Sequence, residues 1–193
     1  MKKLIVMIAF TGSLISLGAQ DVIWKLTYDV SFPFGTTKTF ADQVSWRGLS
    51  LDMDRLVNDN LALGVGVGWN TFVQKYPDSY YQNDEMLLHG TQVRYINDIP
   101  ITARFSWYQP MDQIEPYFTL GVGTIWQEMR REIGLFAFTG SYWQFVLAPE
   151  LGTVVPLGMS AYGTLKVKYT YGFKTGDNDN TLSFLSIGLG VAW

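Results

Sequence analysis

Residues 61–70 read LALGVGVGWN, and this segment carries the clearest signal of how the chain folds. Its odd positions carry large apolar side chains: Leu61, Leu63, Val65, Val67 and Trp69. Its even positions are small or polar. A repeat of two is the period of a β-strand, because successive side chains of a strand point to opposite faces. A helix repeats every 3.6 residues and would not place small residues at every second position. The stretch therefore predicts a strand with one large apolar face and one small face.

The same alternation recurs along most of the chain. It predicts eight strands, at residues 21–32, 44–56, 60–73, 88–108, 116–130, 142–156, 161–174 and 181–193. The connectors between them alternate between short ones (57–60, 110–115, 157–160) and longer polar ones (33–43, 74–87, 131–141, 175–180). An even number of strands lets a meander close on itself, and short turns at one end with long loops at the other are typical of membrane barrels. We therefore predict an all-β fold, an eight-stranded antiparallel up-and-down transmembrane β-barrel.

The character of the two faces separates a membrane barrel from a soluble one. A soluble barrel packs bulky apolar residues inward, which here would leave the glycine-rich and charged face in water. With the apolar face in lipid, the charged strand residues lie in the lumen: Lys25, Asp29, Asp52, Arg104, Glu150, Lys166 and Lys168. Eight strands enclose a space just wide enough for side chains. We therefore expect a fixed ion-pair network rather than a channel. We also expect the substitution Gly66→Ser, on the small face, to have a mild effect.

Composition excludes several classes of function. Only 16% of the 193 residues are charged, against about 25% in average soluble domains. The 14 basic and 17 acidic residues form no basic cluster that could follow a phosphate backbone, so no nucleic-acid partner is expected. Cysteine is absent, which excludes thiolate metal clusters, thiol nucleophiles and disulfides.

The first twenty residues have the outline of a secretory signal peptide. Lys2 and Lys3 precede an apolar stretch from residue 4 to residue 17, and the small Ala19 suits the position before a cleavage site. We predict that residues 1–19 are cleaved and that residues 20–193 form the barrel domain.

Three segments and the C-terminus resemble a known family. The segments are 58–66 (NDNLALGVG), 99–105 (IPITARF) and 115–123 (EPYFTLGVG), and they resemble the small eight-stranded outer-membrane β-barrel domain family of Gram-negative bacteria. Residues 185–193 look like the C-terminal targeting strand of such proteins. The resemblance implies a location in the outer membrane, contact with its lipid and lipopolysaccharide, and no catalytic signature or cofactor. It also implies that the barrel-assembly machinery reads the alternate apolar residues Leu185, Ile187, Leu189, Val191 and Trp193.

Candidate chemistry outside the lumen is sparse. His89 is the single histidine, and no nucleophile elbow accompanies it, so we interpret it as a loop residue and predict no catalytic residue. Residues 177–180, and Asp78 with 83–85, offer oxygen atoms that suit calcium. Neither segment matches a twelve-residue calcium loop, and tight turns use the same residue types. We predict no metal site and no cofactor.

Aromatic residues indicate how the chain meets its surroundings. The seven tryptophans are spread over the strands, which favours membrane-interface belts over stacking against sugars. Tyr76, Tyr80 and Tyr81 cluster in a predicted long loop and form a candidate contact surface.

Location and architecture are therefore better determined than activity. The leading hypothesis is a non-enzymatic integral outer-membrane protein with a structural or surface-interaction role through long extracellular loops, whose extracellular partner is left open. The alternatives are a barrel-rim enzyme acting on lipid A or lipopolysaccharide, and a narrow transport or ligand-passage barrel.

Overall fold

The computed structural model describes residues 22–83, 86–109, 111, 114–157, 162–175 and 181–193, with only the backbone described for 78–83 and 86–88. The predicted signal peptide, residues 1–19, lies outside the described residues. Within the described ranges, no helix is long and apolar enough to cross a membrane.

Eight strands close into one barrel, which confirms the predicted fold class. Each strand pairs antiparallel with its neighbour in the chain, and the last strand pairs with the first. The strands are β1 (Val22–Pro33), β2 (Ser45–Leu56), β3 (Leu61–Asn83), β4 (Met86–Tyr108), β5 (Glu115–Ile133), β6 (Phe136–Pro156), β7 (Tyr162–Gly172) and β8 (Leu182–Ala192). One short helix, α2 (Gly35–Phe40), lies between β1 and β2.

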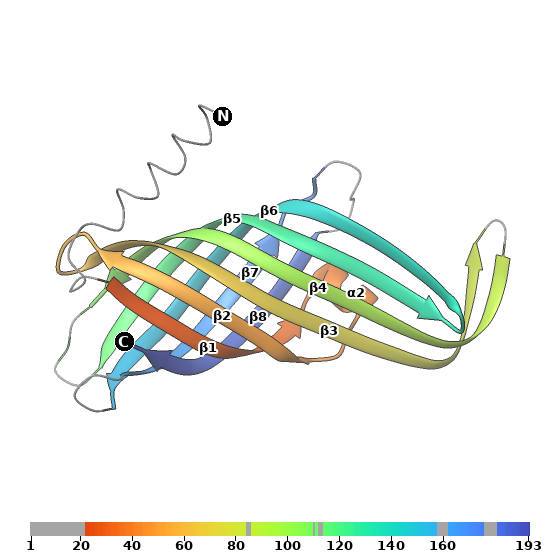
Figure 1. Cartoon of the computed structure of the whole chain (residues 1–193), viewed down its shortest axis with the longest axis horizontal. Coiled ribbons are helices and arrows are strands. Elements are labelled where there is room, and N and C mark those ends of the chain that lie inside the picture. The colour runs from red at the N-terminus through yellow and green to blue at the C-terminus, as the bar shows by residue number, and fades with distance from the viewer. Residues whose placement is uncertain (1–21, 84–85, 110, 112–113, 158–161, 176–180) are drawn as a thin grey trace, which may run out of the picture.

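The two ends of the barrel differ. The start of β1, the end of β8 and the facing strand ends Leu56 and Leu61, Tyr108 and Glu115, and Pro156 and Tyr162 lie at one end, on the left of Figure 1. At the other end, α2 lies beside the barrel mouth while β3, β4, β5 and β6 continue far beyond the remaining strands (Figure 1). Outer-membrane barrels have short turns in the periplasm and their longer connections outside the cell. The end with α2 is therefore the outer end.

Two of the predicted long loops are wrong. Residues 74–87 and 131–141 were expected as loops, but β3 and β4 pair along this region up to Asn83 and Met86, and β5 and β6 pair up to Ile133 and Phe136. The β5–β6 turn contains Gly134 at φ 58, a left-handed conformation that glycine adopts without steric cost. Hydrophobic alternation requires one face in lipid. Beyond the headgroups neither face contacts lipid, so the strict alternation ends while the backbone ladder continues.

A band of apolar side chains surrounds the barrel. Val65 is 52% exposed and Leu189 is 67% exposed, as expected for side chains that face hydrocarbon. Trp107 and Trp193 are exposed near the periplasmic edge of this band, and Trp69 and Trp143 near its outer edge. From residue 61 to residue 69, β3 rises about 27 Å, or roughly 20 Å after a 40° tilt, close to the ~25 Å band of membrane barrels. The predicted assignment of the apolar face to lipid agrees with this surface.

Candidate functional site

The half of the lumen nearer the periplasmic end holds a network of buried charges. Arg104 on β4 is its centre: its Nη1 lies 3.2 Å from Asp52 Oδ1, its Nε 3.0 Å from Asp54 Oδ1 and its Nη2 3.0 Å from Glu150 Oε1. Lys25 Nζ lies 2.7 Å from Asp54 Oδ2, and Lys166 Nζ lies 2.9 Å from Asp52 Oδ2. Three cations thus face three carboxylates, so that the buried charges compensate one another.

The structure joins five of the seven residues predicted for the lumen network, namely Lys25, Asp52, Arg104, Glu150 and Lys166. The other two are also buried, but they have different surroundings. Asp29 accepts hydrogen bonds from Thr27 Oγ1, at 3.1 Å, and from Ser50 Oγ. Lys168 lines a cavity of about 10 Å³ between Asp52 and Thr170, which is at the lower limit for holding one water molecule.

Three central members of the network were missed by the sequence analysis. Asp54 is fully buried and binds both Lys25 and Arg104. Tyr108 donates to Asp54 Oδ2 at 2.8 Å, and Tyr117 donates to Glu150 Oε1 at 3.1 Å. Asp54 lies two residues after Asp52 and Tyr108 four residues after Arg104, so each lies on the same face of its strand as the residue that was predicted. Following the alternation one step further along each strand therefore finds both.

Glycines on the inner face make room for these side chains, and the expectation that Gly66→Ser would be mild is contradicted. A Cβ at Gly66 would lie 2.5 Å from Asp52 Oδ1 and 2.9 Å from Arg104 Cδ. Both atoms belong to side chains fixed by ion pairs, so they cannot move without breaking those pairs. The small inner face is therefore a packing requirement of the charge network.

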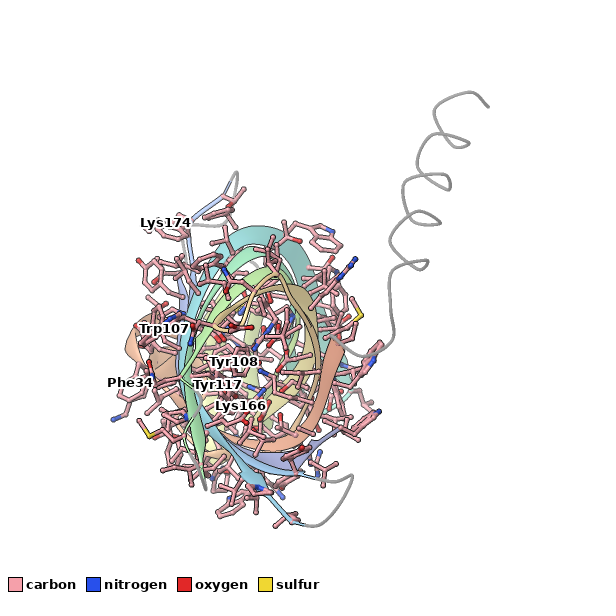
Figure 2. The ribbon with its side chains drawn as sticks, turned by 90° about the vertical axis from the view of Figure 1, so that its left-hand side faces the viewer. Phe34, Trp107, Tyr108, Tyr117, Lys166 and Lys174 are labelled. Atoms are coloured by element: carbon pink, nitrogen blue, oxygen red, sulfur yellow. The ribbon has the colours of Figure 1, made fainter. Side chains whose placement is uncertain are left out.

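Apolar and aromatic side chains close the lumen on the periplasmic side and on the outer side of the network. At the periplasmic end the rings of Tyr108 and Tyr117 lie 5.2 Å apart, inside the barrel wall with Lys166, while Trp107 lies outside it (Figure 2). At the outer end a second cluster fills the barrel: Ala41, Phe72, Ile96, Ile125, Val146, Leu182 and Phe184. Ala41 directly follows α2, so this short helix and its end contribute to the outer closure.

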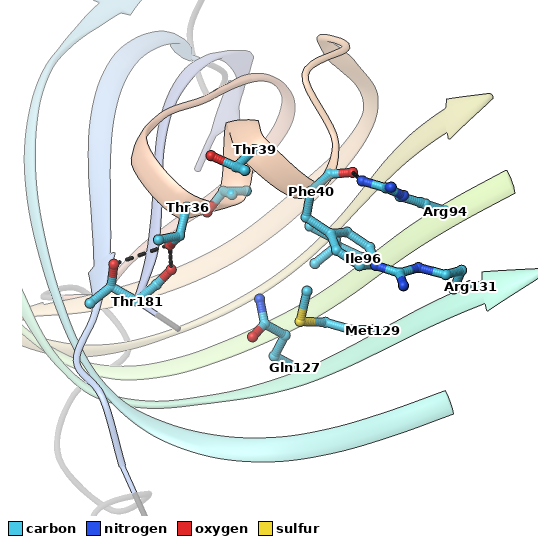
Figure 3. Close-up of a pocket in the computed structure, with 10 residues that line it drawn as sticks. Thr36, Thr39, Phe40, Arg94, Ile96, Gln127, Met129, Arg131 and Thr181 are labelled. Carbon is cyan, nitrogen blue, oxygen red and sulfur yellow. Dashed lines mark hydrogen bonds between the residues drawn. The ribbon is translucent and has the colours of Figure 1, made fainter. Parts of the chain in front are cut away.

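A pocket of about 320 Å³ lies at the outer mouth, next to this apolar cluster, between α2 and the wall formed by β4 and β5 (Figure 3). Arg94 and Arg131 line it and are directly opposite each other in the β4–β5 register. The Phe40 ring lies 5.3 Å from the Arg94 guanidinium and 5.5 Å from that of Arg131. Arg94 Nη1 also donates to the Phe40 carbonyl at 3.2 Å. The pocket therefore presents two adjacent cations at the outer mouth.

The predicted tyrosine surface and the predicted loop histidine both lie in strands, which corrects these assignments. Tyr76 is half-buried on β3, with its ring 4.7 Å from the Arg94 guanidinium. Tyr80 and Tyr81 follow on β3, opposite His89 and residue 88 of β4. The His89 side chain is exposed. The physical reason is the strand extension described above: the polar hairpin stays paired beyond the membrane.

The predicted assembly signal forms the outer face of β8. Ile187, Leu189, Val191 and Trp193 are 42% to 67% exposed, and Leu185 is partly exposed. Trp193 exchanges two backbone hydrogen bonds with Trp24, of 2.9 and 3.0 Å. The terminal residue therefore takes part in closing the barrel.

Metal ligands are not gathered anywhere in the described part of the chain: no group of three or more histidine, aspartate or glutamate residues is placed to hold an ion. Residues 177–180 and 84–85, considered above for calcium, lie outside the described residues.

Comparison with solved structures identifies the fold. No protein-family model matches the chain, and no curated protein matches it in sequence. Three solved structures are similar over most of their length. Neisserial surface protein A is 11% identical with a TM-score of 0.52, covering 89% of this chain and 94% of its own. OprG of Pseudomonas aeruginosa is 16% identical with a TM-score of 0.50, covering 89% and 94%. The outer membrane protease OmpT of Escherichia coli is 7% identical with a TM-score of 0.55, covering 93% and 98%.

These similarities show a shared fold. The chain has the architecture of bacterial outer-membrane β-barrels, and its exposed apolar band is suited to lipid. It is therefore an outer-membrane barrel. Because the three similar structures include a protease, the fold alone does not decide between enzymatic and other roles.

Proposed function

We propose that the protein is a non-enzymatic integral outer-membrane protein that meets the exterior through the protruding parts of β3 to β6. The observation that carries this proposal is the length of these four strands. They extend well beyond the apolar band, whereas β1, β2, β7 and β8 end near it (Figure 1). From Trp69 to Asn83, β3 rises about 46 Å along its own axis.

The protruding wall has two open edges. In the described part of the chain, the β2–β3 ladder ends at Asn70, and beyond it β3 pairs with β4. Among the described residues, the β6–β7 ladder begins at Val146, with one further backbone bond from Phe173 N–H to the Phe145 carbonyl, and the part of β6 before Phe145 is paired with β5. An open edge exposes backbone N–H and C=O groups that can bind another chain. These edges give the outer end of the barrel a surface suited to protein contacts.

Closure of the lumen supports an anchoring role over transport. The charge network occupies the periplasmic half of the lumen, and apolar clusters close the lumen on both sides of the network. The cavity beside Lys168 is only about 10 Å³. It also supports a non-enzymatic role, because the ionisable groups of the network are bound to one another and shielded from substrate. Outer-membrane lipid and lipopolysaccharide would surround the apolar band, and the assembly machinery would read β8 during insertion.

A truncation separates the anchor from the wall. The β3–β4 hairpin would be shortened to a tight turn joining residues 74 and 94, and the β5–β6 hairpin to one joining residues 129 and 140. A strain lacking the protein would be complemented with the wild type or with the shortened barrel, and surface phenotypes such as adherence would be compared. We expect the shortened barrel to insert normally, as shown by heat-modifiable gel migration, but to fail to complement. Full complementation by the shortened barrel would contradict the proposal.

Two measurements test the alternatives directly. Lipid A from cells with and without the protein would be compared by mass spectrometry, and a mass change that depends on the protein would favour a rim enzyme. Single-channel recording in a planar bilayer would test passage, and stable conductance steps would favour a transport role. We expect neither.

A further inference from the structure

The two open edges of the protruding wall differ in how well they are protected against pairing with another chain. Natural proteins block exposed strand edges with charged side chains, proline and β-bulges. The outer part of β3 has all three: Lys75 and Pro77 are exposed, and the β3–β4 register shifts between Tyr76 and Ser79. The edge of β3 is therefore poorly suited to receive a further strand.

The direction of the backbone groups on β3 adds to this protection. Val57 N–H donates to the Leu61 carbonyl, so the odd-numbered residues of β3 direct their N–H and C=O groups to the side of β2. Beyond the end of the β2–β3 ladder, this side is the open edge. The Thr71 carbonyl already accepts a hydrogen bond from Ser45 Oγ there, at 2.6 Å, and Pro77 has no N–H to offer.

The outer part of β6 has none of these protections. Residues 136–145 contain no charged residue and no proline. The β5–β6 register is continuous from one end of the ladder to the other, without a bulge. Thr139, Ser141 and Trp143 are exposed. Figure 1 shows β6 along the margin of the wall, beyond the point where β7 ends.

The backbone of these three residues points to the open side of β6. Phe173 N–H donates to the Phe145 carbonyl at 2.9 Å, so the odd-numbered residues of β6 direct their N–H and C=O groups away from β5. Ahead of Phe145, the backbone groups of Thr139, Ser141 and Trp143 therefore lie on the open edge. A strand added here would continue the sheet in the place where β7 has ended.

We propose that the edge of β6 at residues 139–143 binds an extended, uncharged segment of another protein as an added β-strand. The backbone groups of the odd-numbered residues supply the hydrogen bonds, as in other cases of strand addition to a sheet edge. Thr139 and Ser141 share a face and favour hydroxyl-bearing or β-branched partner residues, because such cross-strand pairs are stabilising. A charged residue directly opposite would find no counter-charge on residues 136–145. The inference rests on the proposed exterior-facing function and assigns its contact to one of the two edges.

A second copy of this chain does not fit the β6 edge. Two barrels in one membrane have β6 strands that run in the same direction, which leaves parallel pairing, whereas antiparallel pairs are two to three times more common. Two barrels in opposing membranes would pair antiparallel. Their β3–β4 hairpins reach past the end of the β5–β6 hairpin (Figure 1), so each would run into the opposite membrane.

Peptide binding to the purified full barrel in detergent tests the proposal. The probe is a fluorescein-labelled octapeptide of alternating threonine and valine, and binding is measured by fluorescence anisotropy against empty micelles. One comparison peptide has its threonines replaced alternately by glutamate and lysine, and another is methylated at every second backbone nitrogen. We expect saturable binding of the first peptide and at least tenfold weaker binding of the other two. No binding of the first peptide, or equal binding of all three, would overturn the proposal.

Substitutions on the two edges locate the contact. Ser141→Pro removes an N–H that points to the open side, and Ser141→Lys keeps this N–H but adds a charge. Val73→Pro and Val73→Lys are the matched controls, because Val73 has the same backbone direction on the edge of β3. The Ser141 variants should weaken peptide binding at least tenfold and the Val73 variants less than twofold. Heat-modifiable migration shows which variants are folded.

Equal losses at the two positions, or unchanged binding in the folded Ser141→Lys variant, would overturn the assignment to β6. Self-association of the wild type that Ser141→Lys abolishes would assign the edge to a second copy and overturn the proposed partner. Failure of this inference and failure of the proposed function remain distinguishable. Adherence restored by Ser141→Lys but not by the shortened barrel would overturn only the β6 edge, whereas full complementation by the shortened barrel would overturn the function itself.

Discussion

Arg104 Nη2 lies 3.0 Å from Glu150 Oε1, although β5 separates the strands that carry the two residues. The side chains meet over the inner face of β5 because Gly121 and Thr119, the inward residues of β5 at this level, are small. The contact is fully buried and is shared with Lys166 and Tyr117. It therefore links β4 to β6 through side chains as well as through the sheet.

Neutralising Glu150 should destabilise the barrel strongly. Glu150→Gln keeps the side-chain size but leaves Arg104 and Lys166 without one of their carboxylates. Removing one partner of a buried ion pair costs about 3–5 kcal/mol. Urea unfolding in detergent or lipid measures the change. Glu132→Gln, at a partly exposed pair, is the control and should change stability by less than about 1 kcal/mol. An unchanged midpoint for Glu150→Gln would rule out an energetically important network.

Adding one methyl group at Gly66 should also be costly. Gly66→Ala places a Cβ against Asp52 and Arg104, and overpacking of this kind costs about 1–3 kcal/mol. Gly163→Ala is the matched control, because its new Cβ would contact only the flexible end of the Leu157 side chain, at 3.3 Å or more. The same unfolding assay compares the two variants. Equal stability of both would show that the inner face has spare room.

A charge on the lipid face should oppose insertion. Val65 lies midway along the part of β3 between Leu61 and Trp69, and it is half-exposed. Val65→Arg near the midplane should cost about 2–4 kcal/mol. Val57→Arg, in the exposed periplasmic turn, should have little effect. Folding yield into lipid vesicles and unfolding midpoints report both variants. Similar losses in the two would mean that the lipid-facing band is wrongly placed.

The terminal aromatic residue should matter for biogenesis more than for stability. Trp193→Ala retains the two backbone bonds to Trp24 but removes the side chain that we propose the assembly machinery reads. We expect less inserted protein in cells and more periplasmic degradation. Trp24→Ala removes an aromatic side chain from the paired strand and should insert at near wild-type levels. Heat-modifiable migration measures insertion. If Trp193→Ala inserts as well as the wild type, β8 does not act through its terminal aromatic residue.

The face of the strand on which a residue lies explains which parts of the site could be predicted. Asp52 and Lys166 were assigned to the lumen because their neighbours in sequence are large and apolar, and their burial agrees with this. Asp54 follows the same rule, one step further along β2 than Asp52. The outer halves of β3 to β6 could not be found in this way, since neither face of these segments contacts lipid.

The alternation of residue types along each strand is enough to predict one lipid-facing face and one small or charged face, and therefore a membrane barrel. This information is local, because side-chain direction alternates with every residue of a strand. Which of the buried charges contact one another depends on the closed barrel. Arg104 reaches Asp52, Asp54 and Glu150 through the strand register and the closure of the sheet. Helix α2 reaches Arg94 and Arg131 because it folds over the mouth that those strands form. Contacts between residues so far apart in the sequence depend on barrel geometry, which cannot be read from a local sequence pattern.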